Sequence, residues 1–198
     1  MIRTLLLVLT LVAVPVLGYA QDDGVLNSAE TINRGNFKLA AFPILIFGEG
    51  NRDNTFGIGL RGGYGFTDNF DVEGKVTFYD DVTFIGADAE AWLVRGPIDF
   101  SVGGGFHFAQ ADASPDFKGL DLTALFSGHL APRLELYGAL DTAFNWYNNS
   151  GGDFKTIHIV PGIEYAISDN LDLLVEVGLG VNDNASHYLA GGLAFYIR

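Results

Sequence analysis

The side chains that could act as nucleophiles, bases or metal ligands are few and scattered. The chain has no cysteine, and its four histidines are His107, His129, His158 and His187. A catalytic or metal site needs such groups to converge. On the strands predicted below, these histidines lie at different heights and partly on different faces. We therefore expect no metal site and no cofactor.

The best candidates for a nucleophile and its base fall near one rim of the predicted fold. Ser186, His187 and Asp183 lie there, as do His107 and Asp112. Ser186 and His187 are adjacent in an extended strand, so their side chains point to opposite faces. They are poorly placed for a nucleophile–base hydrogen bond. We expect no catalytic residue, and the alternative is a membrane-embedded enzyme that acts on lipid or peptide at this rim.

Charged residues occupy one face of three consecutive extended segments. They are Arg61, Glu73, Lys75, Asp88 and Glu90. Hairpin registers compatible with the turns place Arg61 beside Glu73 and Lys75 beside Asp88. A register shifted by two would oppose Glu73 and Asp88, which is unfavourable. The sequence therefore predicts a compact salt-bridge cluster.

Carboxylates outnumber basic groups on the same face of the other segments. Four of them share one layer at one mouth, which only Lys38 interrupts: Asp71, Asp99, Glu135 and Asp172. Further acids on this face are Asp121, Asp141, Glu164 and Glu176. Because rings of carboxylates favour cations, the interior is predicted to prefer cations.

The composition excludes several classes of protein. The length of 198 residues fits one domain. A formal net charge of −13 argues against nucleic acid as a partner, since phosphate binding needs clustered Lys and Arg. Hydrophobic residues make up 48% of the chain, yet beyond the first twenty positions they alternate with polar ones. This pattern lacks the long apolar run of a transmembrane helix.

The first 20 residues have the pattern of a secretory signal peptide. Arg3 precedes an apolar stretch, and small residues in Gly18-Tyr19-Ala20 suit a cleavage site before Gln21. Residues 21–35 are polar and without a period. We interpret them as a flexible N-terminal lead-in, and residues 36–198 as the folded domain.

From Asn36 onward the hydrophobic period is two, which indicates β-strands. Ten strands are predicted, mostly long enough to cross a membrane when tilted. Their ranges are Phe37–Phe47, Thr55–Phe66, Phe70–Tyr79, Val82–Arg95, Ile98–Phe108, Leu120–Leu130, Leu134–Tyr147, Phe154–Ile167, Leu171–Val181 and Ser186–Ile197. Pro43 and Pro161 each remove a ladder hydrogen bond, and eight strands is the alternative if two weaker boundaries fail.

Connections and strand starts both repeat with the period of a hairpin. Tight turns such as Thr67-Asp68-Asn69 alternate with connections that are mostly longer, which is typical of outer-membrane barrels. Each strand after a tight turn opens with an apolar–charged–apolar triplet, as the first strand does. The triplets are Phe37-Lys38-Leu39, Phe70-Asp71-Val72, Ile98-Asp99-Phe100, Leu134-Glu135-Leu136 and Leu171-Asp172-Leu173.

The alternation gives two faces, and three features place the apolar one outside. Aromatic residues at strand ends, such as Phe66 and Trp146, suit membrane interfaces. Only 18% of the residues are charged, which is low for a soluble surface. The other face is rich in glycine and would leave a soluble core full of voids. A soluble, exported barrel that binds an apolar ligand, with the faces inverted, is the less favoured alternative.

The last strand resembles the terminal strand of bacterial outer-membrane β-barrel proteins. In the segment 188–198, Gly192, Phe195 and Ile197 match the pattern that the barrel-assembly machinery reads, whereas Arg198 departs from it. The turns Thr-Asp-Asn-Phe-Asp-Val and Ser-Asp-Asn-Leu-Asp-Leu are similar to those of small OmpA/OmpX-like barrels. The resemblance implies an all-β, transmembrane, antiparallel up-and-down meander barrel in the outer membrane.

These observations predict an integral outer-membrane barrel with a structural role or a narrow, cation-preferring pore. Ten strands lie between the filled eight-stranded barrels and the open sixteen-stranded porins. The expected partners are outer-membrane lipids and, during biogenesis, the assembly machinery. The sequence leaves the oligomeric state and the state of the lumen, open or plugged, undecided.

Overall fold

The computed structural model describes residues 24–48, 53–112, 115–148 and 152–198. The predicted signal peptide lies outside the described residues. Ten strands follow one another along the chain. They are β1 (Phe37–Ile46), β2 (Thr55–Thr67), β3 (Phe70–Tyr79), β4 (Val82–Val94), β5 (Asp99–Ala111), β6 (Phe117–Ala131), β7 (Leu134–Tyr147), β8 (Asp153–Ser168), β9 (Leu171–Gly180) and β10 (Tyr188–Ile197).

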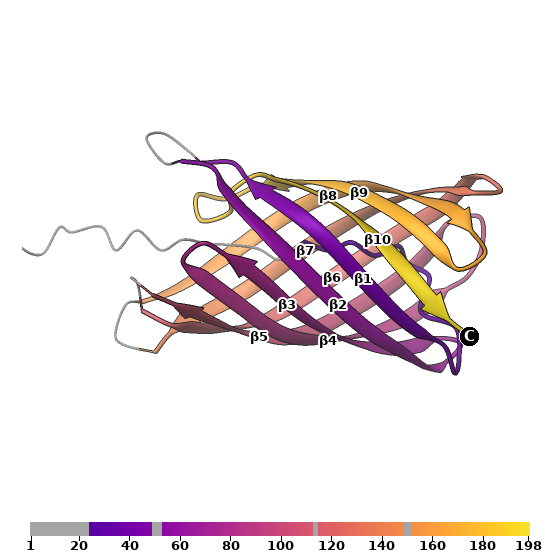
Figure 1. The fold of residues 1–198 in the computed structure, drawn as a ribbon, viewed down its shortest axis with the longest axis horizontal. Helices are drawn as coiled ribbons and strands as arrows, with labels where there is room; N and C mark the ends of the chain where they lie inside the picture. Colours follow the sequence, from indigo (N-terminus) through magenta and orange to yellow (C-terminus); the bar gives the residue numbers. More distant parts are fainter. Residues whose placement is uncertain (1–23, 49–52, 113–114, 149–151) are drawn as a thin grey trace, which may run out of the picture.

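Each strand pairs antiparallel with its neighbours in sequence, and β1 pairs with β10 to close the barrel (Figure 1). The predicted ten-stranded up-and-down barrel is therefore confirmed, and the eight-stranded alternative is not. The main boundary difference lies at one hairpin. There β5 continues to Ala111 and β6 begins at Phe117, so this connection is shorter than the sequence indicated.

The two ends of the barrel differ. The "turn end" carries the tight turns at 68–69, 95–98, 132–133 and 169–170, together with the C-terminus. The "loop end" carries the opposite ends of the strands, with the described connecting residues 47–48, 53–54, 80–81, 112, 115–116, 148, 152 and 181–187. This alternation of tight turns with mostly longer loops is the asymmetry of outer-membrane barrels.

The outer surface is apolar because every second residue of each strand points outward. On β2, for example, Phe56, Ile58 and Leu60 are all about half exposed. A ten-residue strand such as β3 rises about 33 Å along its axis. A tilt of about 40° turns this into about 25 Å, the height of the apolar band in such barrels. No helix among the described residues is long and apolar enough to cross a membrane.

Large rings fill the space above several inward-facing glycines. The ring of Phe42 lies directly over Gly59, Tyr137 over Gly162 and Tyr188 over Gly178. Each ring is buried, and its glycine leaves it the room that a Cβ would take. The glycines therefore pack against rings here, which fill the voids that the sequence analysis associated with a glycine-rich face.

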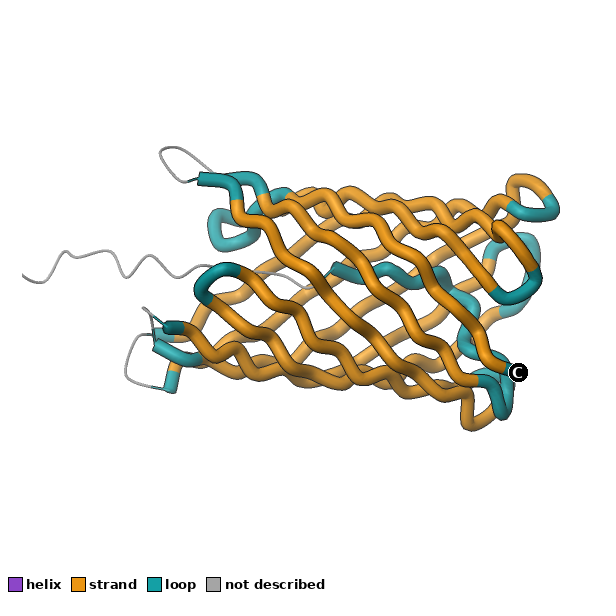
Figure 2. The backbone as a smooth tube through the Cα atoms, viewed as in Figure 1, coloured by secondary structure: helices purple, strands orange, loops and turns teal. Residues whose placement is uncertain are grey.

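Residues 24–36 run inside the ring of strands and reach the turn end, where β1 begins (Figure 2). We call this segment the plug. Val25, Leu26, Ala29 and Ile32 on it are buried. The structure here differs from the expectation of a flexible lead-in over 21–35. The difference arises because the lumen wall supplies hydrogen-bond partners and an apolar surface that the segment's own sequence pattern does not reveal.

Candidate functional site: the plugged lumen

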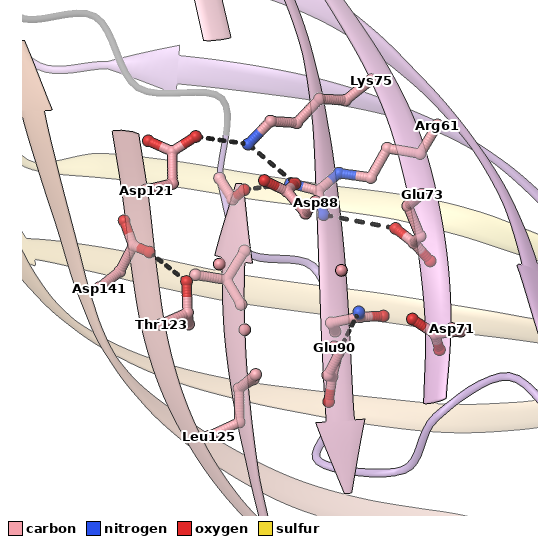
Figure 3. A pocket seen from close by; sticks show the side chains of 16 residues that line it. Arg61, Asp71, Glu73, Lys75, Asp88, Glu90, Asp121, Thr123, Leu125 and Asp141 are labelled. Atoms are coloured by element: carbon pink, nitrogen blue, oxygen red, sulfur yellow. Dashed lines mark hydrogen bonds and ion pairs between the residues drawn. The ribbon is translucent and has the colours of Figure 1, made fainter. Parts of the chain in front are cut away.

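Ion pairs join neighbouring strands on the inner face of the barrel wall, and Figure 3 shows those of Arg61 and Lys75. Nζ of Lys38 lies 2.9 Å from Oε1 of Glu73, and Arg61 lies 3.7 Å from the other oxygen of Glu73. Nζ of Lys75 lies 2.9 Å from Asp88 and 3.3 Å from Asp121. Glu73 is therefore shared by two bases, and Lys75 is shared by two acids.

The predicted hairpin registers behind this cluster are wrong. Arg61 is directly opposite Lys75, and Glu73 is directly opposite Asp88. The second of these is the like-charge pairing that the sequence argument rejected. A bulge between Gly65 and Thr67 alters the pairing next to the β2–β3 turn. The opposite charges still meet because long side chains reach diagonal neighbours on adjacent strands.

Glu176 in the middle of β9 is the main anchor of the plug. Its Oε1 accepts a hydrogen bond of 2.8 Å from the amide of Val25, and its Oε2 accepts one of 2.6 Å from the amide of Leu26. The hydroxyls of Tyr137 and Tyr188 donate to the same carboxylate, at 2.8 and 3.0 Å. Four donors thus satisfy a carboxylate that is almost fully buried.

Other polar contacts hold the plug along its length. The amide of Ile32 donates to Asp71 at 2.6 Å, and the amide of Ala29 donates to Ser127 at 3.1 Å. The side chain of Asn27 donates to Glu90 at 2.9 Å and accepts from Lys38. The guanidinium of Arg61 donates to the carbonyl of Gly24.

The backbone of the plug requires unusual torsion angles at both ends. Gly24 and Gly35 have φ of 72° and 82°, in the left-handed region that glycine adopts without steric cost. Leu26 also has a positive φ, 43°, which costs energy for a branched residue. Its hydrogen bond to Glu176 offsets this cost, since successive amides around a left-handed residue form a concave anion site.

The four acids of the predicted mouth ring have different surroundings. Asp71 accepts from the plug, and Asp99 accepts from the amide of Gly96 at 3.0 Å. Glu135 is buried, whereas Asp172 is half-buried and lines a cavity of about 130 Å³ with Glu164. The ring therefore does not surround an open mouth, because the plug passes through it.

The other two predicted lumen acids, Asp121 and Asp141, lie nearer the loop end. Asp121 contacts Nδ1 of His107 at 2.9 Å as well as Lys75. Asp141 accepts a hydrogen bond of 2.6 Å from the hydroxyl of Thr123. Together with the plug, these groups border a cavity of only about 50 Å³, which is room for very few water molecules. The lumen is therefore constricted at this level.

The rim candidates for catalysis do not form a nucleophile–base pair among the described residues. Ser186 meets a histidine through its backbone carbonyl, which lies 2.9 Å from Nε2 of His158. Nδ1 of His187 accepts from the amide of Gly180. The second ring nitrogen of His107 lies 2.8 Å from the side-chain oxygen of Asn145. Asp112 and Asp183 are exposed.

The three residues of the resemblance to terminal strands lie on β10, at the seam with β1. Phe195 and Ile197 point outward and are nearly half exposed. Gly192 lies against the backbone of Ala41 and the side chain of Phe42. The alternation of β10 therefore continues the outer belt across the seam.

Similarity to known proteins agrees with this architecture. An outer membrane channel from Pseudomonas putida F1 superposes with a TM-score of 0.56 at 8% identity, covering 89% of this chain and 100% of that one. The KdgM porin gives a TM-score of 0.46 at 12% identity, covering 81% and 99%. The N-terminal β-barrel domain of Pseudomonas aeruginosa OprF gives 0.40 at 14%, covering 84% and 100%. No curated protein matches the chain in a sequence comparison.

The sequence itself identifies the family. Residues 4–189 match the outer membrane protein beta-barrel domain, which is most of the chain. The fold, the apolar exterior and this match agree, and the soluble ligand-binding alternative conflicts with all three. The chain belongs to the outer membrane protein beta-barrel domain family, and it is a transmembrane β-barrel of the outer membrane.

Proposed function

We propose that the barrel is a narrow, cation-preferring pore that its own plug holds closed in the described conformation. The observation that carries the proposal is the charge of the lumen wall. Carboxylates project inward at successive heights, whereas the inward-facing Lys and Arg of the described strands are Lys38, Arg61 and Lys75. The acids in question are Asp71, Glu73, Asp88, Glu90, Asp99, Asp121, Glu135, Asp141, Glu164, Asp172 and Glu176.

This excess of negative charge gives the lumen a preference for cations once water fills it. Charged rings in a pore of low-dielectric walls focus the field and select by sign. The three bases already pair with acids, so the other carboxylates make the net charge of the lumen negative. A ten-stranded barrel also has a small diameter, so the pore admits small solutes.

The plug supplies the closed state. Many of its contacts are hydrogen bonds to wall side chains. Water can replace such a bond at a net cost of about 1 kcal/mol, or about 1.5–3 kcal/mol where the partner is charged. Removing the plug would leave Glu176, Asp71 and Glu90 facing the lumen. Opening therefore exposes additional carboxylates rather than an apolar surface alone.

The proposal places the turn end on the periplasmic side, with lipid around the outer belt and β10 as the strand that the assembly machinery engages. It assigns no enzymatic activity. Both ring nitrogens of His107 already have neighbours, Asp121 and Asn145, and Ser186 meets His158 through its backbone carbonyl.

Ion selectivity of the unplugged barrel tests the proposal. A variant that lacks residues 24–33 is folded in detergent and checked by heat-modifiable migration on a gel. It is then placed in a planar bilayer with a tenfold KCl gradient. We expect a reversal potential whose sign reports K⁺ preference over Cl⁻. A folded variant that conducts nothing, or that prefers Cl⁻, would overturn the pore assignment and favour a purely structural role.

A further inference from the structure

Three possible metal ligands from distant parts of the chain come together at the turn end. They are Glu30 on the plug, His129 on β6 and Glu135 on β7, and one ligand atom from each lies within 4.8 Å of the other two. Nδ1 of His129 is 3.7 Å from Oε1 of Glu30. His129 and Glu135 are directly opposite each other on paired strands, so the barrel itself fixes their separation.

Glu135 has an unsatisfied oxygen in this cluster. The residue is 5% exposed, and among the described residues no donor reaches its buried Oε1. Burying an acceptor without a partner costs about 1–3 kcal/mol, and more for a charged group. Such an atom needs an explanation, and a cation held between Glu135 and its two neighbours supplies one.

The surroundings also favour a cation. The cluster borders a cavity of about 300 Å³ that Glu164, Asp169 and Asp172 also line, together with one base, Arg133. A bound cation would favour the charged form of every carboxylate in the cavity.

We propose that Glu30, His129 and Glu135 bind Zn²⁺. Imidazole nitrogen and carboxylate oxygen are both ligands that Zn²⁺ accepts, and a site with three protein ligands keeps water in the fourth position. Ca²⁺ and Mg²⁺ prefer sites made of oxygen alone, so the histidine is the residue that points to a transition metal. Zn²⁺ ligand distances are about 2.0–2.2 Å, and the exposed side chains of Glu30 and His129 are free to move the short way that this requires.

This site would join the plug to the barrel wall, because Glu30 belongs to the plug and the other two ligands belong to the strands. Bound Zn²⁺ would stabilise the plugged state by the free energy of binding. The site rests on the contacts of the closed barrel and does not depend on whether the barrel conducts ions. The sequence alone did not suggest these three residues together, because Glu30 lies in a segment for which no position was predicted.

Zn²⁺ titration of the untagged, folded, full-length barrel by calorimetry in detergent tests the site. We expect one Zn²⁺ per barrel, with His129→Ala and Glu30→Gln each weakening binding at least tenfold. His187→Ala is the matched control, since His187 is an exposed histidine at the opposite end, and it should bind as the unsubstituted barrel does. No binding, or equal affinity of the His129→Ala and His187→Ala variants, would overturn the proposal.

A second measurement locates the metal. Hydrogen exchange of amides 25–36 should slow by at least threefold when Zn²⁺ is added to the unsubstituted barrel. Zn²⁺ should leave exchange in the Glu30→Gln variant unchanged. Ca²⁺ should leave exchange unchanged in both the unsubstituted barrel and the variant. Slowing that persists in Glu30→Gln would place the metal away from the plug and contradict the site. A negative result for the Zn²⁺ site would not change the expected ion selectivity of the unplugged barrel. The two proposals can therefore be rejected independently.

Discussion

The backbone amide of Leu26 donates a hydrogen bond of 2.6 Å to Oε2 of Glu176, which lies in the middle of β9. This contact joins the N-terminal segment to a strand 150 residues further along the chain. The amide of Val25 binds the other carboxylate oxygen. A single glutamate therefore fixes the inner end of the plug in the lumen.

Replacing that carboxylate by an amide should loosen the plug and leave the barrel intact. Glu176→Gln removes the charge that strengthens both backbone hydrogen bonds, and bonds to charged groups contribute about 1.5–3 kcal/mol. Hydrogen exchange at amides 25–33 should accelerate by roughly 10- to 100-fold. Asp99→Asn is the control, because Asp99 is a buried lumen acid that bonds to the amide of Gly96. Equal acceleration in both variants would show that Glu176 is no specific anchor.

The position of the plug can be tested by a disulfide. The chain has no cysteine of its own, and the amide of Ala29 lies 3.1 Å from Oγ of Ser127. A barrel with Ala29→Cys and Ser127→Cys should form an intramolecular disulfide in most molecules, seen by mass spectrometry after mild oxidation. The control barrel with Ala29→Cys and Thr77→Cys should form no such disulfide. The plug contacts β3 at Asp71, through the amide of Ile32, and Thr77 lies about 20 Å further along that strand. The reverse result would place the plug elsewhere.

The packing of rings over glycines predicts a cost for adding one methyl group. Gly59→Ala would put Cβ within the space of the Phe42 ring, and overpacking of this kind costs about 1–3 kcal/mol. At Gly62 on the same strand, the nearest atom to a new Cβ is Cδ2 of Leu39 at 3.6 Å, an ordinary contact. Urea unfolding in detergent should therefore show Gly62→Ala within about 0.5 kcal/mol of the unsubstituted barrel. Equal stability of the two variants would contradict the packing.

The outer belt predicts a cost that depends on depth. Leu122 lies near the middle of β6 and Leu130 near its end at the turns, and both are more than half exposed. In a lipid bilayer, Leu122→Arg should destabilise the barrel by about 2–4 kcal/mol and Leu130→Arg by about 0–1 kcal/mol. Reversible unfolding from liposomes gives both values. Similar small costs at both positions would mean that this face does not contact hydrocarbon.

Much of the barrel could be predicted from local patterns. The period of two and the tight turns located the ten strands, because side-chain direction alternates along every strand. The hairpin register between Arg61 and Lys75 could not be predicted, since it depends on the bulge beside Gly65. Charge complementarity predicted the right ionic partners but the wrong register. Opposite charges can form an ion pair from diagonal positions on paired strands as well as from directly opposite ones.

The plug could not be predicted from its own sequence. Its backbone lacks a regular period, and its hydrogen bonds go to side chains such as Asp71 and Glu176 that are distant in the sequence. One signal was present: the apolar residues Val25, Leu26 and Ile32 stand in an otherwise polar segment. A second signal was the surplus of lumen acids without predicted basic partners, because backbone amides of the plug bond to two of them, Asp71 and Glu176.

The single-channel conductance of the full-length barrel and of the variant lacking residues 24–33, recorded in identical bilayers, tests the plugged pore most directly. Because the plug leaves a cavity of only about 50 Å³ beside the charged wall, the full-length barrel should stay closed for most of the recording. The shortened barrel should hold a steady, larger conductance. Equal conductance of two correctly folded barrels, whether both open or both closed, would contradict the account.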